Sequence, residues 1–178
     1  MAEKQPLLNS DHVYQGRRVT LRVDTIQLPS GRESQREIVE FGDCVAIVAV
    51  DSEGKALLVR QYRAAVGRML LEIPAGMIDP GETPEQSAYR ELREETGYSA
   101  KRMEPLGGLY ASPGYSTEYL HFFLATELEE SQDTPDEDEI NKVVRVPLKD
   151  VPGLIDSGEI SDGKSAAGLL RVILRMQS

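Results

Sequence analysis

One short stretch, residues 76–98 with the sequence GMIDPGETPEQSAYRELREETGY, restricts this chain more than any other. It crowds together five glutamates: Glu82, Glu85, Glu91, Glu94 and Glu95. Glu91 and Glu95 are four residues apart, so on a helix they are neighbours and repel each other by roughly a few tenths of a kcal/mol. The crowding predicts that a positively charged group is meant to sit there.

The same stretch carries the signals of a helix that begins after Thr83. Thr83 can cap the helix, Pro84 fits the first helical position, and Gln86 can close a capping box. Gly97 is a typical residue for ending a helix. A period of 3.6 residues places the last three glutamates of the stretch roughly opposite the residues that can pack.

Bulk properties exclude several classes of protein. The formal net charge of the 178 residues is −10, with no basic block, so we expect no nucleic-acid partner. Cys44 is the only cysteine, which excludes a disulfide framework and agrees with a reducing compartment. The longest apolar run, CVAIVAV, is too short to span a bilayer, and the first residues lack an apolar signal core. We therefore expect a soluble protein of the cytoplasm with no membrane partner.

Alternating and apolar runs predict a mixed succession of strands and helices after an irregular lead-in over residues 1–16. Strands are expected at 17–28, 33–41, 44–50, 56–62, 68–76, 103–111, 119–126 and 142–147, and further helices at about 148–157 and at 165–176. The expected fold class is α+β, a sandwich of mixed sheets and helices with an N-terminal antiparallel strand pair.

The acidic residues suggest a chemistry by themselves. Carboxylates at i, i+3 and i+4 converge on one patch, which suits hard cations such as Mg²⁺ or Mn²⁺. Such a cation can neutralise a diphosphate and lower the pKa of a bound water. Arg90 precedes Glu94 by four residues and can brace the acidic face rather than contact a substrate. Gly76 lets the backbone bend sharply, so that the carbonyl of Ala75 can point at a metal. The alternative is a solvated helix face held by Glu–Arg pairs.

Gly76, Glu82 and the run 90–98 follow the spacing Gly-x5-Glu-x7-Arg-Glu-U-x-Glu-Glu-x-Gly-U, where U is a bulky apolar residue. This pattern resembles the signature of the Nudix hydrolases, with Tyr98 as a mild departure. The resemblance implies a Nudix fold over residues 43–178. It also implies these metal ligands: Glu91, Glu95 and the carbonyl of Ala75, with Glu94 as a further ligand and Glu82 in support.

Flanking motifs resemble the ADP-ribose pyrophosphatase branch of that family. They are ASPGYSTE at 111–118 and VRQYRAAVGRMLLEIPAG at 59–76, together with REIVEFGDCVAIV at the end of the N-terminal strands. The branch implies Mg²⁺-dependent hydrolysis of ADP-ribose to AMP and ribose 5-phosphate, with Mn²⁺ as a possible substitute.

The same resemblance assigns the residues that bind a nucleoside diphosphate sugar. Arg63 would clamp the diphosphate, Glu118 would reach the distal ribose, and Arg36 is a weaker candidate offered by a partner subunit. Pro113 would shape the loop. The alternatives are a surface role for Arg63 and a plain turn at Pro113.

The resemblance further implies a homodimer in which residues 1–42, the lead-in and strand pair, are exchanged between subunits. The alternative is that the pair extends the sheet of its own domain. A general base is expected from the acidic loop before the last strand, with Glu139 as first choice and Glu137 as second; a merely solvated acidic loop is the alternative. The chain has no tryptophan to stack on adenine, and Tyr14 or Tyr62 could take that place.

Two rival functions are kept open. The first is hydrolysis of another nucleoside diphosphate sugar, since the signature does not depend on base or sugar. The second is a non-catalytic sensing module that binds ADP-ribose without cleaving it. All acidic positions of the signature are present, which favours the enzyme.

Overall fold

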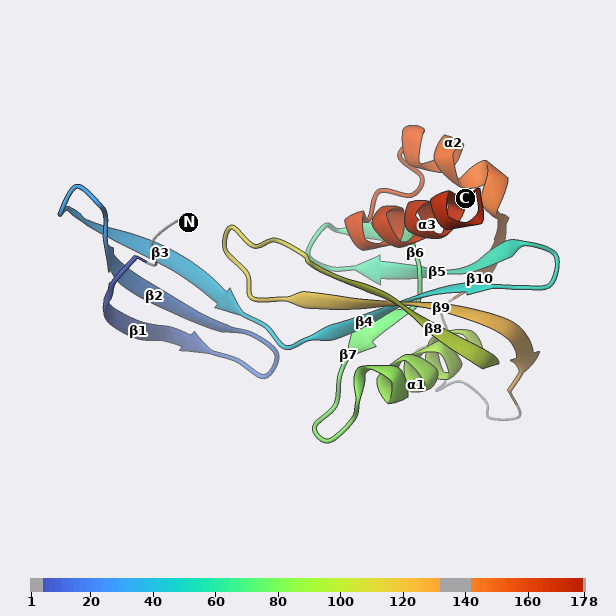
Figure 1. The fold of residues 1–178 in the computed structure, drawn as a ribbon, viewed down its shortest axis with the longest axis horizontal. Helices are drawn as coiled ribbons and strands as arrows, with labels where there is room; N and C mark the ends of the chain where they lie inside the picture. The colour runs from blue at the N-terminus through green and yellow to red at the C-terminus, as the bar shows by residue number, and fades with distance from the viewer. Residues whose placement is uncertain (1–4, 132–141, 178) are drawn as a thin grey trace. The chain divides into compact units, whose positions relative to one another are not determined.

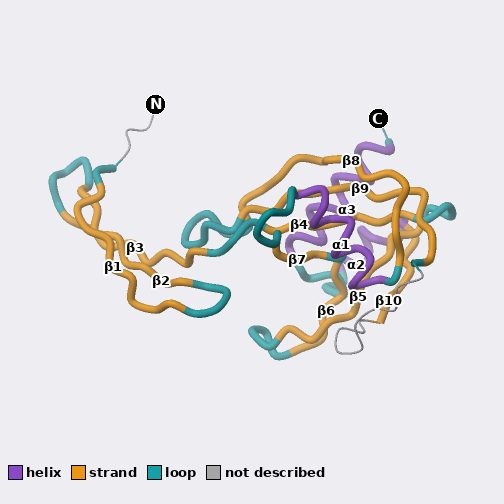
Figure 2. The backbone as a smooth tube through the Cα atoms, turned by 90° about the horizontal axis from the view of Figure 1, so that it is seen from below, coloured by secondary structure: helices purple, strands orange, loops and turns teal. Residues whose placement is uncertain are grey.

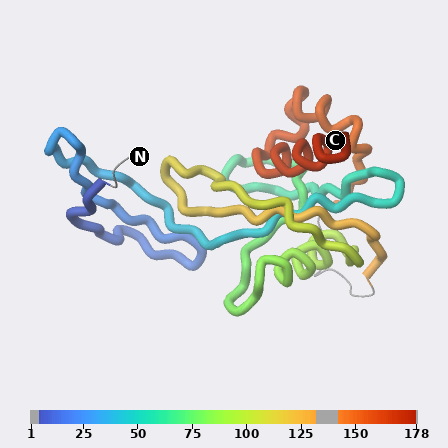
Figure 3. The backbone as a smooth tube through the Cα atoms, in the orientation of Figure 1, coloured from blue at the N-terminus to red at the C-terminus, as the bar shows by residue number. Residues whose placement is uncertain are grey.

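The computed structural model describes residues 5–131 and 142–177. Contacts divide the chain into two compact units. The N-terminal unit comprises residues 1–43 together with 110–119, and the second unit comprises residues 44–109 together with 120–178. Figure 3 traces the chain through both units by residue number.

The N-terminal unit is built on a three-stranded antiparallel sheet in the order β1-β2-β3 (Figure 1). Its strands are β1 (Leu7–Gln15), β2 (Thr20–Gln27) and β3 (Glu33–Glu40). The expected antiparallel pair is confirmed by β2 and β3, whose register runs from Thr20 opposite Glu40 to Gln27 opposite Glu33.

The expectation of an irregular lead-in over residues 1–16 is wrong, because β1 pairs with β2 along its length. None of the nine residues of β1 is buried. A strand whose faces are both open to solvent needs no alternation of apolar and polar residues, so the usual sequence signal of a strand is missing.

Residues 110–119 lie along β3 in the same unit. The amide of Val39 donates to the carbonyl of Tyr115 at 2.7 Å, and the amide of Thr117 donates to the carbonyl of Val39 at 3.0 Å. Among the described residues of this unit only Asp24 and Ile26 are buried. The unit is therefore held together mainly by backbone hydrogen bonds.

The second unit contains a sheet in the order β10-β5-β4-β9-β8, with β6 paired to β5 and β7 paired to β4. Its strands are β4 (Cys44–Val50), β5 (Lys55–Arg63), β6 (Arg68–Glu72), β7 (Ala75–Met77), β8 (Tyr98–Tyr110), β9 (Tyr119–Glu130) and β10 (Lys142–Pro147). Its helices are α1 (Pro84–Thr96), α2 (Val151–Asp156) and α3 (Gly163–Met176), with a 3-10 turn η2 (Leu148–Asp150).

All described helices belong to this second unit (Figure 2). Helix α1 covers one face of the sheet, and α2 and α3 lie on the other face (Figure 1). Both α1 and α3 contact β4, which runs between them. The expected sandwich of helices around mixed strands is thereby confirmed. Within the described residues no helix is long and apolar enough to cross a membrane.

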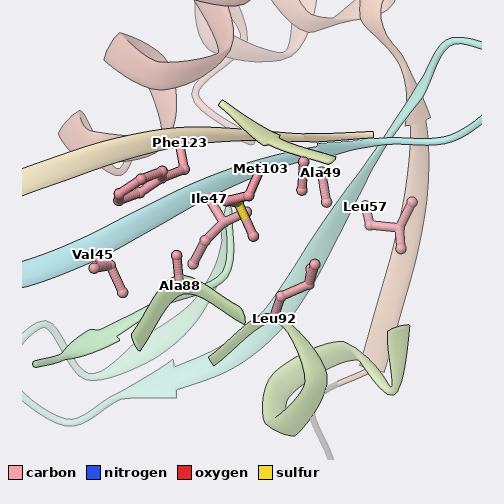
Figure 4. Packing of buried hydrophobic residues seen from close by; sticks show 9 residues of the cluster. Val45, Ile47, Ala49, Leu57, Ala88, Leu92, Met103 and Phe123 are labelled. Atoms are coloured by element: carbon pink, nitrogen blue, oxygen red, sulfur yellow. The ribbon is translucent and has the colours of Figure 1, made fainter. Parts of the chain in front are cut away.

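The centre of this unit is β4, all seven of whose residues are buried. It pairs in parallel with β9 and antiparallel with β5 and β7. Helix α1 packs Ala88 and Leu92 against it, and Figure 4 shows these side chains from close by. The cluster consists of Val45, Ile47, Ala49, Leu57, Ala88, Leu92, Met103, Phe123 and Ala125. This core holds the strand and helix that carry the acidic residues.

The single strand expected over residues 68–76 is two strands, because β6 ends at Glu72 and β7 begins at Ala75. Between them lie Ile73 and Pro74, both buried. Proline has no amide proton to give to a ladder, so the chain changes partner at this point. The break allows β6 to pair with β5 while β7 pairs with β4.

Candidate active site

The acidic helix α1 begins and ends as its sequence predicts. The Thr83 side chain accepts from the amide of Gln86, and the Gln86 side chain accepts in turn from the amide of Thr83. Pro84 occupies the first turn, and Gly97 closes the helix in the left-handed region with φ of 72°. These caps set which turn of the helix faces strand β7.

Gly76 and Glu91 meet where β7 approaches α1. A Cβ atom built on Gly76 would lie 2.1 Å from Cδ of the Glu91 side chain. No real Cβ atom could be accommodated there, so only glycine leaves room for the carboxylate. The Glu91 carboxylate therefore lies directly against the backbone of strand β7 at Gly76.

Glu95 is the most buried of the glutamates in this helix, with 8% of its surface exposed. Its Oε2 accepts a hydrogen bond from the amide of Ala75 at 2.9 Å. Burial raises the pKa of Glu95 to about 7, and the neighbouring charge of Glu91 acts in the same direction. The expectation that this residue lies opposite the packing side is wrong, because Ala75 at the start of strand β7 offers its carboxylate a hydrogen-bond donor inside the protein.

Arg90 forms hydrogen bonds with three other glutamates of the stretch. Its guanidinium donates twice to Glu82, with both distances 2.9 Å, once to Glu91 at 2.6 Å and once to Glu94 at 3.0 Å. It also donates to the carbonyl of Met77 at 3.0 Å. The hydrogen bonds from Arg90 lower the pKa of Glu82 to about 2. Arg90 is thus a positive group at the centre of the acidic stretch.

The chemistry of this cluster suits a divalent cation. The carboxylates of Glu82, Glu91 and Glu94 surround a single guanidinium, and carboxylate oxygens are the ligands that hard cations prefer. Burial raises the pKa of a fourth carboxylate, that of Glu95, and a bound cation would favour its charged form. Over residues 5–131 and 142–177, however, no three acidic, histidine or cysteine side chains are already arranged as a metal-binding set. Arg90 and a cation would therefore compete for Glu82, Glu91 and Glu94.

A second charged cluster surrounds Glu72, a residue that our sequence reasoning missed. The Arg63 guanidinium donates to both Glu72 oxygens, at 2.8 Å from Nε and 2.7 Å from Nη2. Lys164 binds the same carboxylate, which is 1% exposed. Burial opposes ionisation, but the hydrogen bonds from Arg63 and Lys164 lower the pKa of Glu72 overall. A glutamate inside the apolar run MLLEIP was the available signal, since buried carboxylates are nearly always paired.

Three of the remaining candidate residues are not part of the second unit. Arg36, Pro113 and Glu118 belong to the N-terminal unit. Arg36 donates to its neighbours Ser34 and Gln35. Pro113 lies in a turn closed by hydrogen bonds to the carbonyl of Ser112.

The two candidate bases, Glu137 and Glu139, fall outside the described residues. Their role as general base therefore stays a prediction.

Comparison with known proteins places the chain. Residues 40–167 match the NUDIX domain, and the chain belongs to this family of hydrolases. It is 41% identical over 165 residues to the ADP-ribose pyrophosphatase of Bacillus subtilis (strain 168), covering 92% of this chain and 89% of that protein. It is 36% identical over 164 residues to the methanol dehydrogenase activator of Bacillus methanolicus, covering 91% and 89% of the two chains.

Among solved structures, one described as an ADP compounds hydrolase shares the fold with a TM-score of 0.90 and 25% sequence identity. The match covers 99% of this chain and 96% of that chain. The NUDIX assignment, the complete acidic signature and the fold therefore agree.

Proposed function

We propose that the protein hydrolyses the pyrophosphate bond of ADP-ribose in the presence of Mg²⁺, giving AMP and ribose 5-phosphate. The observation that carries the proposal is that the Glu91 and Glu95 carboxylates lie against Ala75 and Gly76 of strand β7. The likeness to a protein named ADP-ribose pyrophosphatase supports the choice of substrate.

The acidic cluster would hold the metal through Glu91, Glu95 and the carbonyl of Ala75, with Glu94 as a further ligand. When bound there, Mg²⁺, or Mn²⁺ in its place, would supply positive charge to the diphosphate and would lower the pKa of the attacking water. Glu82 keeps Arg90 in place through its paired hydrogen bonds.

The protein's other side chains would position the diphosphate and take up the proton. Arg63 binds phosphate oxygens with the part of its guanidinium that Glu72 leaves open. Glu139, or Glu137 in its place, accepts the proton of the attacking water. The water oxygen bonds to one phosphorus while the anhydride bond between that phosphorus and the bridging oxygen breaks. The bridging oxygen leaves with the other phosphate.

We also propose a cytoplasmic homodimer that exchanges its N-terminal strands. The N-terminal unit exposes apolar side chains on β1, namely Leu7, Leu8, Val13 and Tyr14, each at least 48% exposed. A second copy could cover them. In such a dimer Arg36, Pro113 and Glu118 would contribute to substrate binding. Sedimentation of the purified protein tests the dimer, and a monomer at micromolar concentration would reject it.

The activity is tested by incubating the purified protein with ADP-ribose, ADP-glucose, GDP-mannose and a dinucleoside polyphosphate, with Mg²⁺ or with chelator. Release of AMP from ADP-ribose, abolished by chelator, is the expected result. Preference for another sugar would keep the metal site and reject the substrate. Binding of ADP-ribose without turnover of any compound would identify a sensing module instead.

A further inference from the structure

The first turn of helix α3 is fastened to the segment that leads into the acidic site. The amide of Ile73 donates to Oγ of Ser165 at 2.9 Å, and Ser165 in turn donates to Asp162, the N-cap of α3. A Cβ atom built on Gly168 would lie 3.1 Å from Cδ1 of Ile73, so the helix packs closely here. Ala75, which donates to Glu95, is only two residues further along the chain.

Lys164 extends this attachment to Glu72. Its ammonium binds Oε2 of Glu72 and also Asp162 at 2.9 Å, and its side chain is 15% exposed. Arg63 and Lys164 bring two positive charges to the cluster, and Glu72 and Asp162 bring two negative charges, so the cluster is neutral. Without Lys164 its formal charge would be −1.

The guanidinium of Arg63 is fixed on one side and open on the other. Nε and Nη2 of its guanidinium are both bound to Glu72. Nη1 has no hydrogen-bond partner within the part of the chain that the structure describes, and the Arg63 side chain is 40% exposed. One edge of the guanidinium is therefore fixed on a buried carboxylate while another donor group is left available. Ala75, three residues after Glu72, donates its amide hydrogen to the Glu95 carboxylate, so the cluster borders the acidic site.

We propose that Lys164 is a positioning residue for diphosphate binding: it anchors Glu72, and Glu72 holds Arg63 with its open edge toward the substrate. The proposal rests on the proposed function, because it assigns Arg63 to the diphosphate. Lys164 lies outside the Nudix signature and 92 residues from Glu72 along the chain. Its removal would leave Glu72 held only by a half-exposed arginine and would leave Asp162 without its lysine, which disfavours an anionic ligand.

The test compares three variants of the full chain. Lys164→Met is expected to raise KM for ADP-ribose about ten-fold while kcat changes much less, since partners of ligand-binding groups typically contribute about 10-fold or more. Lys164→Arg keeps the charge and is expected to restore most of the affinity. Lys149→Met removes an exposed lysine of η2 and is the matched control, expected to behave as the wild type.

A second readout does not depend on the substrate. The ¹H–¹⁵N NMR signal of the Arg63 Nε–H group, assigned with an Arg63→Lys variant, reports its hydrogen bond to Glu72. In Lys164→Met we expect exchange of this proton with water to accelerate about ten-fold, and in Lys149→Met to stay unchanged. Should the wild type fail to cleave ADP-ribose, the proposed function fails, while this signal still decides the role of Lys164.

Two outcomes would overturn the proposal. The first is an unchanged KM together with an unchanged Arg63 signal in folded Lys164→Met. The second is an equal loss of kcat and affinity in Lys164→Arg and Lys164→Met, which indicates a structural role alone. If Lys164→Met does not fold, the double variant Glu72→Gln/Lys164→Met avoids an incompletely paired buried charge and should show the same rise in KM.

Discussion

The two units of the molecule use the same strand geometry but differ in what stabilises it. In the N-terminal sheet, β1 has nine residues and none is buried. In the second unit, β4 has seven residues and all are buried. Backbone ladders alone add little net free energy, because unfolded chains make equivalent hydrogen bonds to water. The second unit therefore has its own core, whereas only Asp24 and Ile26 are buried among the described residues of the N-terminal unit.

The largest effect is expected at the acidic site of the second unit. Glu95→Gln should lower turnover of ADP-ribose at least about 100-fold, because the buried carboxylate would lose the charge with which we propose that it binds the cation. Steady-state rates at saturating Mg²⁺ measure it. The matched control is Glu85→Gln, which removes an exposed carboxylate from the first turn of the same helix and should retain activity. Near-normal turnover by a folded Glu95→Gln protein would reject the metal site.

The next largest difference between the two units is expected in the free energy of unfolding when a leucine is shortened to alanine. Leu92 is fully buried between α1 and β4, so Leu92→Ala should lower the free energy of unfolding by about 3 to 4 kcal/mol. Leu8 is 48% exposed on β1, so in a single chain Leu8→Ala should change this free energy by less than about 0.5 kcal/mol. Chemical denaturation at low and at high protein concentration measures both variants. In the proposed dimer a second copy covers Leu8, so the cost of Leu8→Ala should grow as the protein concentration rises, and a cost that stays this small at every concentration would contradict that role of β1.

The pH dependence of stability should also reside in the second unit. Folding raises the pKa of Glu95 from its ordinary value of 4.5 to about 7, so the folded state binds this proton more tightly than the unfolded state. The resulting stabilisation is complete below about pH 4.5 and is lost as the pH rises through about 7. It amounts to at most about 3 kcal/mol.

Metal-free wild type and Glu95→Gln are compared by denaturation across this range, since other titrations cancel in the difference. Mg²⁺ should remove the loss above pH 7, because a cation replaces the proton on Glu95. Identical pH profiles for the two proteins would contradict the assignment of the raised pKa to this residue.

Glycine substitutions in two turns should have small effects that are alike in the two units. Gly31 in the β2–β3 turn has φ of 82° and Gly54 in the β4–β5 turn has φ of 73°, and a Cβ atom at either position would meet no neighbour. Alanine at either position should cost about 1 kcal/mol for its left-handed backbone. The free energy of unfolding, measured by denaturation with a signal from each unit, checks both values. A negligible cost at Gly31 alone would show that the N-terminal sheet does not unfold with the rest.

What the sequence predicted correctly was local. The capping box at Thr83, the end of the helix at Gly97 and the buried strand β4 each depend on neighbours within a few residues. The Nudix signature likewise lies within one segment. These features can be predicted from the sequence because their hydrogen bonds and burial involve residues close together in the chain, at the spacing of a helix or a strand.

What the sequence did not reveal depends on distant partners. The break between β6 and β7 arises because Ile73 and Pro74 are buried while the chain changes strands. The pairing of Glu72 with Lys164 joins residues 92 positions apart, and no periodicity connects them. Strand β1 was missed because it has no buried face, and without one its sequence shows no alternation of apolar and polar residues.

The hydrogen bond between Ile73 and Ser165 has a consequence for folding during synthesis of the chain. Ile73 is added to the growing chain 92 residues before Ser165. At about 5 to 20 residues per second, this interval lasts roughly 5 to 20 seconds. Once residue 98 has been added, the nascent chain carries the full acidic signature without the helix that holds the segment leading into it. Catalytic competence therefore comes late in translation, and a chain cut short before α3 would be a substrate for proteases rather than a working hydrolase.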